Sequence, residues 1–249
     1  MYKRQVIYDI KKGKFIFTPK DFVLSGITPS LKWRKRGNKL LISARVNYYC
    51  LDRILYCIKF ENNGRTMSIE NCYLIDCKVS RIGWGWSGDK VVYVNRGNDR
   101  VYVSDIEGKK KAVLMRKKDV KYLVVSPNGD RVVVAKPTYL EKKVYLLDGV
   151  RNFIEKGQKI KIKEAPIYWG DWFPDSKRML TCENKKGVWS FFIYNFDTNK
   201  IEKIFSKKFS DECVDYKLSP DGEKILIVEY IKEKAYIYEI KSKKLYEIF

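Results

Sequence analysis

The first chemical feature of this chain is a residue that it lacks, because none of its 249 residues is a histidine. Ser-His-Asp and Cys-His nucleophiles, His-ligated zinc and histidine pH switches all need an imidazole, so these are excluded. Facing carboxylates could still cleave a glycosidic bond, and four aspartates near the starts of predicted strands are candidates: Asp76, Asp119, Asp171 and Asp215. Because aspartate also caps turns, we expect no catalytic residues and predict that the chain is not an enzyme.

The cysteines do not have the spacing of a metal site. No two of the six are separated by the two residues that structural zinc sites use. Cys57 lies in the apolar run 54–58, where a free thiol behaves as a small hydrophobic group. We expect buried free thiols, with disulfides as the alternative, at these positions: Cys50, Cys57, Cys72, Cys77, Cys182 and Cys213. No metal and no cofactor is predicted, since the Pro-Asp-Gly turns offer too few oxygens for calcium.

The chain is strongly basic and has the composition of a folded protein. It carries 51 Lys and Arg against 30 Asp and Glu, a formal net charge of +21, and is 45% hydrophobic and 14% aromatic. Disordered chains lack so much aromatic surface. No uncharged apolar segment approaches the ~20 residues that cross a bilayer, and the N-terminus has no signal-peptide pattern. We expect a cytoplasmic protein without a membrane span, unless a leader has been removed.

One pattern recurs along the chain and organises it. A tight turn, a basic residue and an apolar run occur five times, and the copies start at Gly37, Gly88, Gly129, Ser176 and Gly222. An apolar run precedes the turn, and an aromatic-rich strand, a polar turn and a further strand follow it, so each copy predicts a four-stranded antiparallel meander. Such a meander cannot cover both of its apolar faces, so the units must pack on one another. Radial packing, as in a β-propeller, meets this need.

The turns of the last three copies resemble a known family. They are Ser126-Pro-Asn-Gly129, Phe173-Pro-Asp-Ser176 and Ser219-Pro-Asp-Gly222, each followed by a basic residue and an aliphatic run. Together with the Tyr-x-x-Asp segments at Tyr102 and Tyr145, they resemble the WD-type repeats of TolB-like propellers. The resemblance covers nearly the whole chain and implies an all-β propeller of four-stranded antiparallel blades. Similar domains serve as interaction platforms for other proteins.

The N-terminal segment 6–18 matches the third strand, turn and fourth strand of the repeat. The chain therefore holds five full repeats plus an N-terminal hairpin, which we expect in a single domain, 1–249. We prefer a six-bladed ring with an incomplete sixth blade, because TolB-like repeats usually build six or more. The alternative is a five-bladed ring in which the hairpin adds to or replaces the outer strands of the final unit.

Charge suggests where a partner could bind. In a propeller, the first and third turns of every unit lie on one face of the disc, and this face would gather basic residues. The predicted binding residues are Arg34, Lys35, Arg36, Lys109, Lys110 and Lys111. The leading hypothesis is a non-enzymatic platform for another protein. The alternatives are a module for nucleic acid or another polyanion, and third a carboxylate-based carbohydrate-active enzyme. We expect Trp33, Trp86 and Trp172 to pack between sheets rather than to stack on bases.

Overall fold

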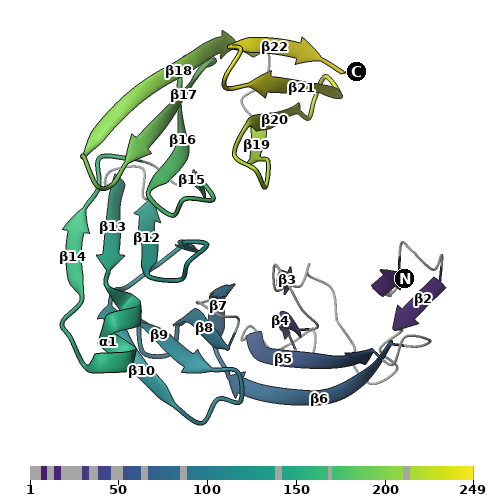
Figure 1. The fold of residues 1–249 in the computed structure, drawn as a ribbon, viewed down its shortest axis with the longest axis vertical. Coiled ribbons are helices and arrows are strands. Elements are labelled where there is room, and N and C mark those ends of the chain that lie inside the picture. Colours follow the sequence, from purple (N-terminus) through teal and green to yellow (C-terminus); the bar gives the residue numbers. More distant parts are fainter. Residues whose placement is uncertain are drawn as a thin grey trace. The chain divides into compact units, whose positions relative to one another are not determined.

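A computed structural model describes ten segments of the chain, which are residues 7–9, 14–17, 30–33, 39–45, 53–62, 67–84, 89–137, 142–167, 170–209 and 214–248. These residues form one two-stranded sheet and five four-stranded sheets (Figure 1). The two-stranded sheet consists of β1 (Ile7–Asp9) and β2 (Lys14–Phe17). Its antiparallel register confirms the predicted N-terminal hairpin.

The five larger sheets follow the chain in order. Sheet 1 contains β3 (Ser30–Trp33), β4 (Lys39–Arg45), β5 (Arg53–Asn62) and β6 (Met67–Asp76). Sheet 2 contains β7 (Val79–Trp84), β8 (Lys90–Asn95), β9 (Arg100–Asp105) and β10 (Lys111–Arg116). Sheet 3 contains β11 (Tyr122–Val125), β12 (Arg131–Pro137), β13 (Lys142–Asp148) and β14 (Lys161–Glu164). Sheet 4 contains β15 (Gly170–Trp172), β16 (Arg178–Lys185), β17 (Val188–Asn195) and β18 (Lys200–Lys208). Sheet 5 contains β19 (Val214–Leu218), β20 (Lys224–Glu229), β21 (Lys234–Glu239) and β22 (Lys244–Glu247).

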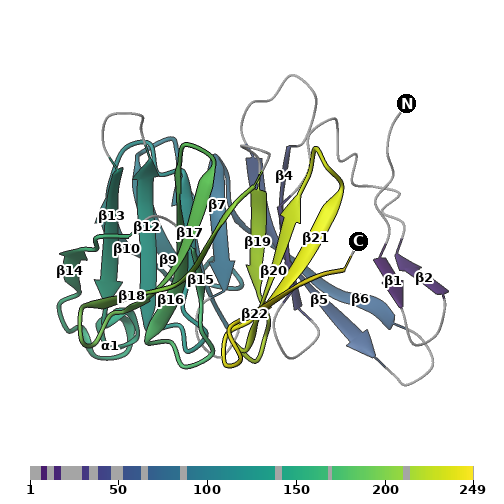
Figure 2. The same ribbon diagram turned by 90° about the horizontal axis from the view of Figure 1, so that it is seen from above.

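Each large sheet is an antiparallel meander, in which consecutive strands are hydrogen-bonded neighbours. Figure 2 shows β19, β20 and β21 of sheet 5 side by side in this order. The five repeats predicted from the turns therefore correspond to five sheets. The fourth strand of each meander lies at a sheet edge, and no other described strand pairs with that edge.

The chain divides into two compact units. The first comprises residues 1–123 and 150–160, and the second comprises residues 124–149 and 161–249. Sheets 1 and 2 lie in the first unit, and sheets 4 and 5 lie in the second. A single domain over residues 1–249 stays a prediction.

The core of the first unit lies between sheets 1 and 2. Leu55 and Cys57 of β5 are fully buried in one cluster with Val91 and Tyr93 of β8. The hydroxyl of Tyr93 donates a hydrogen bond of 2.7 Å to Asp76, at the end of β6. Apolar packing and polar contacts such as this one thus hold the two meanders together, as expected for sheets that cannot cover their own faces.

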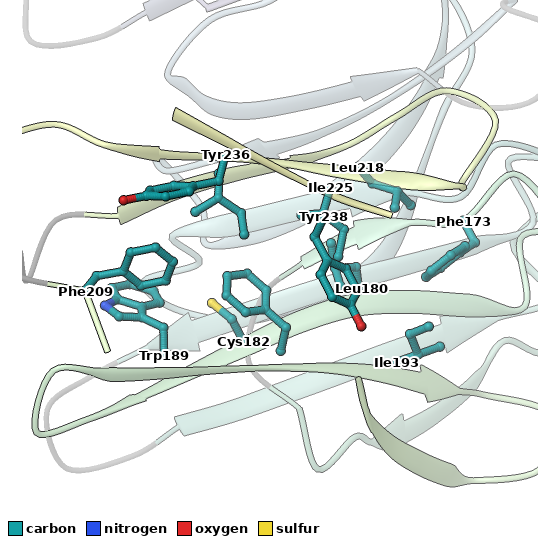
Figure 3. Packing of buried hydrophobic residues seen from close by; sticks show 12 residues of the cluster. Phe173, Leu180, Cys182, Trp189, Ile193, Phe209, Leu218, Ile225, Tyr236 and Tyr238 are labelled. Atoms are coloured by element: carbon teal, nitrogen blue, oxygen red, sulfur yellow. The ribbon is translucent and has the colours of Figure 1, made fainter. Parts of the chain in front are cut away.

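The core of the second unit lies between sheets 4 and 5 (Figure 3). Phe191 of β17 is fully buried and stacks on Phe205 of β18, with ring centroids 4.5 Å apart. Phe205 in turn stacks on Tyr238 of β21 at 4.1 Å. The hydroxyl of Tyr238 donates to the carbonyl oxygen of Ile204 at 3.0 Å, so the buried ring keeps a partner for its polar atom.

The repeated turns owe their sequence to one hydrogen-bond pattern. The backbone N–H of Gly129 donates to the carbonyl of Ser126, and Gly222 does the same to Ser219. The serine hydroxyl then accepts the N–H of the residue that opens the next strand, at 2.9 Å from Arg131 and 2.8 Å from Lys224. Both glycines have positive φ, 75° and 78°, which explains why glycine stands there.

Several local expectations meet the structure with mixed results. Trp172 is 8% exposed, which confirms that it is a core residue, whereas Trp33 and Trp86 lie outside the residues whose side chains are described.

Cys57 and Cys182 are buried free thiols as predicted, but Cys72 and Cys77 are free and exposed, so the prediction was wrong for these two. Both lie at or beyond the outer strand β6, which has one open edge. Cys50 and Cys213 lie outside the described residues.

A short helix was not expected. α1 (Val150–Lys156) connects β13 to β14, where the repeat predicts a simple polar turn. Val150 is its buried residue, and Arg151 pairs with Glu155 one turn later, at 3.1 Å. One apolar anchor in seven residues gives no readable helical period, so the sequence pattern could not reveal this helix.

Candidate functional site

The predicted basic residues are only partly described. Lys109 and Lys110 lie in the turn between β9 and β10, and their backbone N–H groups donate to Asp105. The ammonium of Lys109 pairs with Glu107 at 2.6 Å, and that of Lys111 lies 3.4 Å from Asp76. The remaining three, Arg34, Lys35 and Arg36, lie outside the described residues. Whether all six share one binding surface stays a prediction.

The basic residue that follows each repeated turn has a structural role. Arg131 reaches from sheet 3 to sheet 4, where it pairs with Asp197 at 2.5 Å, and it also pairs with Asp148 of β13 at 3.1 Å. Arg178 pairs with Asp175 of its own turn at 2.6 Å. Burial lowers the pKa of Arg131, but the hydrogen bonds of Asp197 and Asp148 outweigh it and raise the pKa overall. Arg131 and Arg178 thus stabilise a sheet contact and a turn.

The aspartates considered for catalysis are hydrogen-bonded within the fold. Asp171 of β15 accepts the ammonium of Lys217 at 2.6 Å and the N–H of Leu218 at 3.0 Å, which joins sheet 4 to sheet 5. Asp215 accepts the hydroxyl of Tyr230 at 3.2 Å. Asp76 accepts the hydroxyl of Tyr93 as described above. These contacts give the carboxylates a structural function. The described segments also contain no cluster of three or more Cys, Asp or Glu that could hold a metal ion.

A pocket of about 320 Å³ opens between sheets 4 and 5, within the second unit. Its lining residues come from the end of β18, the end of β20, the following turn and β21. They are Lys207, Lys208, Phe209, Glu229, Lys232, Lys234 and Tyr236. Four of the seven carry an ammonium group. The sequence did not reveal this site, because its two halves, at 207–209 and 229–236, meet only when the sheets pack.

The aromatic wall of the pocket holds one lysine in place. The ammonium of Lys207 lies 4.1 Å from the ring centroid of Tyr236 and 5.7 Å from that of Phe209. The two rings meet edge to face at 5.7 Å, and Figure 3 shows them together at one end of the buried cluster. Cation–π attraction of this kind orients a flexible side chain that would otherwise move freely. The sequence-level signal was the pair Lys207-Lys208 before Phe209.

Two carboxylates adjust the charge of the pocket. Glu229 is 2% exposed and accepts the hydroxyl of Tyr236 at 3.4 Å. Glu247 of β22 pairs with Lys234 at 2.6 Å and raises the pKa of that lysine. Burial, together with Glu247 and Glu229, raises the pKa of the Tyr236 hydroxyl. In the described part of the chain, neither Lys207 nor Lys208 has a carboxylate partner.

The outer strands of the sheets share one feature. Among the residues whose side chains are described, each of these strands exposes a large apolar side chain: Leu74 at 58%, Val113 at 36%, Ile162 at 48%, Ile201 at 51% and Tyr246 at 44%. Lysines flank this residue on β14, where Lys161 and Lys163 adjoin Ile162, and on β18, where Lys200 and Lys203 lie on either side of Ile201. Of these two strands, β18 contains more lysines, four against two. An edge strand presents unpaired backbone groups, and lysine is the residue that commonly discourages unwanted pairing there. The described residues include no helix long and apolar enough to span a membrane.

Comparison with known proteins identifies the architecture. No protein-family model matches the chain, and no curated protein matches it. Among solved structures, TolB from Acinetobacter baumannii is similar with a TM-score of 0.57 at 16% identity, over 97% of this chain and 63% of TolB. The β-propeller domain of Myceliophteria thermophila Cps50 (Swd1) is similar with a TM-score of 0.59 at 14% identity, over 92% of this chain and 73% of that domain.

An enzyme is also among the similar structures. An oligogalacturonate lyase in complex with manganese aligns with a TM-score of 0.61 at 12% identity, over 85% of this chain and 61% of the lyase. The chain thus spans less than two thirds of the length of TolB and of the lyase. Because the similar structures include both enzymes and other proteins, the fold leaves the absence of activity a prediction. The chain has an all-β propeller fold with four-stranded antiparallel blades, similar to that of TolB.

Proposed function

We propose that this propeller is a non-enzymatic platform that binds an acidic, extended segment of another protein along the edge of β18. The observation that carries the proposal is the composition of this edge strand. Its nine residues include Lys200, Lys203, Lys207 and Lys208 against a single acid, Glu202. Ile201 lies among them with 51% of its surface exposed. A strand with this pattern offers both charge and apolar contact to an acidic partner.

The backbone of β18 can supply the main binding contacts. One side of the strand pairs with β17 from Lys200 to Lys208, and no described strand pairs with the other side. An extended peptide can add to such an edge by main-chain hydrogen bonds, while alternate side chains give specificity. Carboxylates of the peptide would face the lysines. The net charge of +21 would speed the approach of an acidic partner.

A designed peptide tests this proposal. The probe is a fluorescein-labelled ten-residue peptide of alternating Glu and Val, and the readout is anisotropy at 150 mM salt. The double variant Lys200→Glu/Lys203→Glu is expected to weaken binding about tenfold or more. Lys161→Glu/Lys163→Glu on the outer strand β14 is the matched control and should bind like the wild type. Equal weakening by both pairs, or no saturable binding, would contradict docking at β18.

The alternative is a polyanion-binding module that uses the predicted residues Lys109, Lys110 and Lys111, together with Arg34, Lys35 and Arg36. Lys110 favours it, because its ammonium has no carboxylate partner in the described part of the chain. Phosphate contacts release counterions, so RNA or heparin binding would fall steeply with salt. If the platform proposal holds, the variant Lys109→Glu/Lys110→Glu/Lys111→Glu elutes from heparin at nearly the same salt as the wild type. A large shift to lower salt would favour the polyanion function.

The same proposal includes the closure of the ring. We propose a six-bladed propeller in a single domain, 1–249, in which β1 and β2 are the outer half of an incomplete blade. Their pairing as an isolated hairpin supports this, since the third and fourth strands of the repeat pair in the same way. Deleting residues 1–20 should then leave the urea midpoint unchanged but abolish binding to the partner that completes the blade. A clear loss of stability would favour the five-bladed alternative.

The location that suits this function is the cytoplasm. Cys57, Cys72, Cys77 and Cys182 are free, which supports a reducing compartment. Cell fractionation with a tagged chain tests this, and recovery from an extracytoplasmic fraction would contradict it.

A further inference from the structure

We propose that the pocket between β18 and β21 binds a phosphate monoester. The pocket and the proposed docking edge share Lys207 and Lys208, but they can be tested separately, because Lys200 and Lys203 lie outside the pocket.

The charge of the pocket indicates that its ligand is a dianion. The pocket gathers the four lysines Lys207, Lys208, Lys232 and Lys234 around the buried Glu229. Glu247 compensates Lys234 from outside, through the 2.6 Å ion pair. Lys207 and Lys208 have no carboxylate partner in the described part of the chain, so their two positive charges are available to a ligand. A phosphate monoester carries a charge close to −2 at pH 7, since its second pKa is about 6, so it would balance these two charges.

The arrangement of Lys207 favours binding. A lysine normally loses side-chain entropy when it is fixed on a ligand. Here the ammonium already lies 4.1 Å from the ring centroid of Tyr236 and 5.7 Å from that of Phe209, so part of this ordering precedes binding. Lys208 follows directly in the chain, and Lys234 belongs to the facing strand β21. A tetrahedral anion with three terminal oxygens can meet such ammonium groups from several directions.

The walls suit an ester more than free phosphate. Phe209 and Tyr236 supply apolar ring surface, and the volume of about 320 Å³ lies at the small end of ligand pockets. A single phosphate fills only a part of that space. No arginine lines the pocket, so the planar fork that binds carboxylates in a bidentate manner is missing from the described lining. The lining therefore favours a small organic phosphate.

Calorimetry of the full chain with phenyl phosphate tests the proposal. The variants are Lys207→Met and Lys208→Met, which keep most of the apolar stem and remove the charge. Lys203→Met on the same strand is the matched control, because it lies outside the pocket. We expect each pocket variant to weaken binding about tenfold, as for a lost hydrogen bond to a charged group, and the control to bind like the wild type. Thermal melting checks that all variants are folded.

Competing ligands test separately whether the pocket requires a dianion and whether it requires the organic group of the ester. Benzoate, a planar monoanion, should bind at least tenfold more weakly than phenyl phosphate, and inorganic phosphate should also bind more weakly. The affinity for phenyl phosphate should fall as the pH drops below about 6, because the ligand gains a proton. Equal binding of benzoate or inorganic phosphate, equal weakening by Lys203→Met, or no saturable binding at millimolar ligand would overturn the proposal. Peptide binding at β18 is measured separately, so either proposal can fail alone.

Discussion

The contact of Arg131 with three groups offers a direct test of how sheets 3 and 4 are joined. Its guanidinium pairs with Asp148 and Asp197 and donates to the carbonyl oxygen of Ser176 at 3.3 Å. The side chains of Arg131, Asp148 and Asp197 are 17%, 25% and 35% exposed, respectively, so water partly screens both ion pairs. Taking about 1 kcal/mol for each pair and about 0.5 kcal/mol for the third bond, Arg131→Met should lower the free energy of unfolding by about 2.5 kcal/mol.

A double-mutant cycle isolates the contact between Arg131 and Asp197, whose two residues are farthest apart in the sequence. Arg131→Met and Asp197→Asn should show a coupling energy of about 1 kcal/mol at pH 7, measured by urea unfolding followed by circular dichroism. The hydrogen bond from Arg131 lowers the pKa of Asp197 in the folded state. This stabilisation is therefore complete above the unfolded-state pKa of about 4, and it is lost as the pH falls through the folded-state value.

The control is Arg151→Met, which removes an exposed ion pair with Glu155. The length of this pair, 3.1 Å, equals that of the pair between Arg131 and Asp148. Its expected cost is below about 0.5 kcal/mol, because the pair joins neighbouring turns of one short helix. A coupling energy between Arg131 and Asp197 that is zero at pH 7, or that is the same at pH 3 as at pH 7, would refute the reasoning.

Two further predictions concern the interior. Gly170→Ala would place a Cβ atom 1.7 Å from the carbonyl oxygen of Leu180, so thermal melting should show a loss of several kcal/mol or no folded protein. In contrast, Gly149→Ala meets no atom within 4 Å and should cost only about 1 kcal/mol for its positive φ of 81°. Burial raises the pKa of Cys57 to about 11, so iodoacetamide at pH 8 should modify the exposed Cys77 before Cys57 and reach Cys57 only on unfolding. Equal rates for the two thiols would contradict the described burial.

Much of the fold can be predicted from the sequence, because each repeat contains a turn whose residue types are set by local hydrogen bonds. Ser126 and Ser219 each bond the residue that starts the next strand, so the same short motif marks the same place in two sheets. Trp172 could be assigned to the core for a related reason, since large residues recur at that position of the repeat. Local pattern failed at α1, where one buried residue, Val150, is too little to produce a period.

The pocket could not be predicted in the same way. Lys207 and Tyr236 come within 4.1 Å of each other although 28 residues separate them in the sequence. Neither residue has an unusual neighbourhood in the chain, where lysine and tyrosine are common. Only the packing of sheet 4 on sheet 5 creates the cavity. The basic turn residues show the opposite case, because the sequence revealed their charge but not the acids that neutralise it.

Ser176 occupies the position that glycine holds in the turns of sheets 3 and 5, and it keeps the same left-handed backbone, with φ of 58°. Its hydroxyl accepts the N–H of Asn128, from the corresponding turn of sheet 3, at 3.0 Å. A glycine would relax the backbone of its own turn and cut this link to the preceding one. The repeats are therefore not interchangeable modules, because a chain in which these two turns were exchanged would lose one of the hydrogen bonds that join sheets 3 and 4.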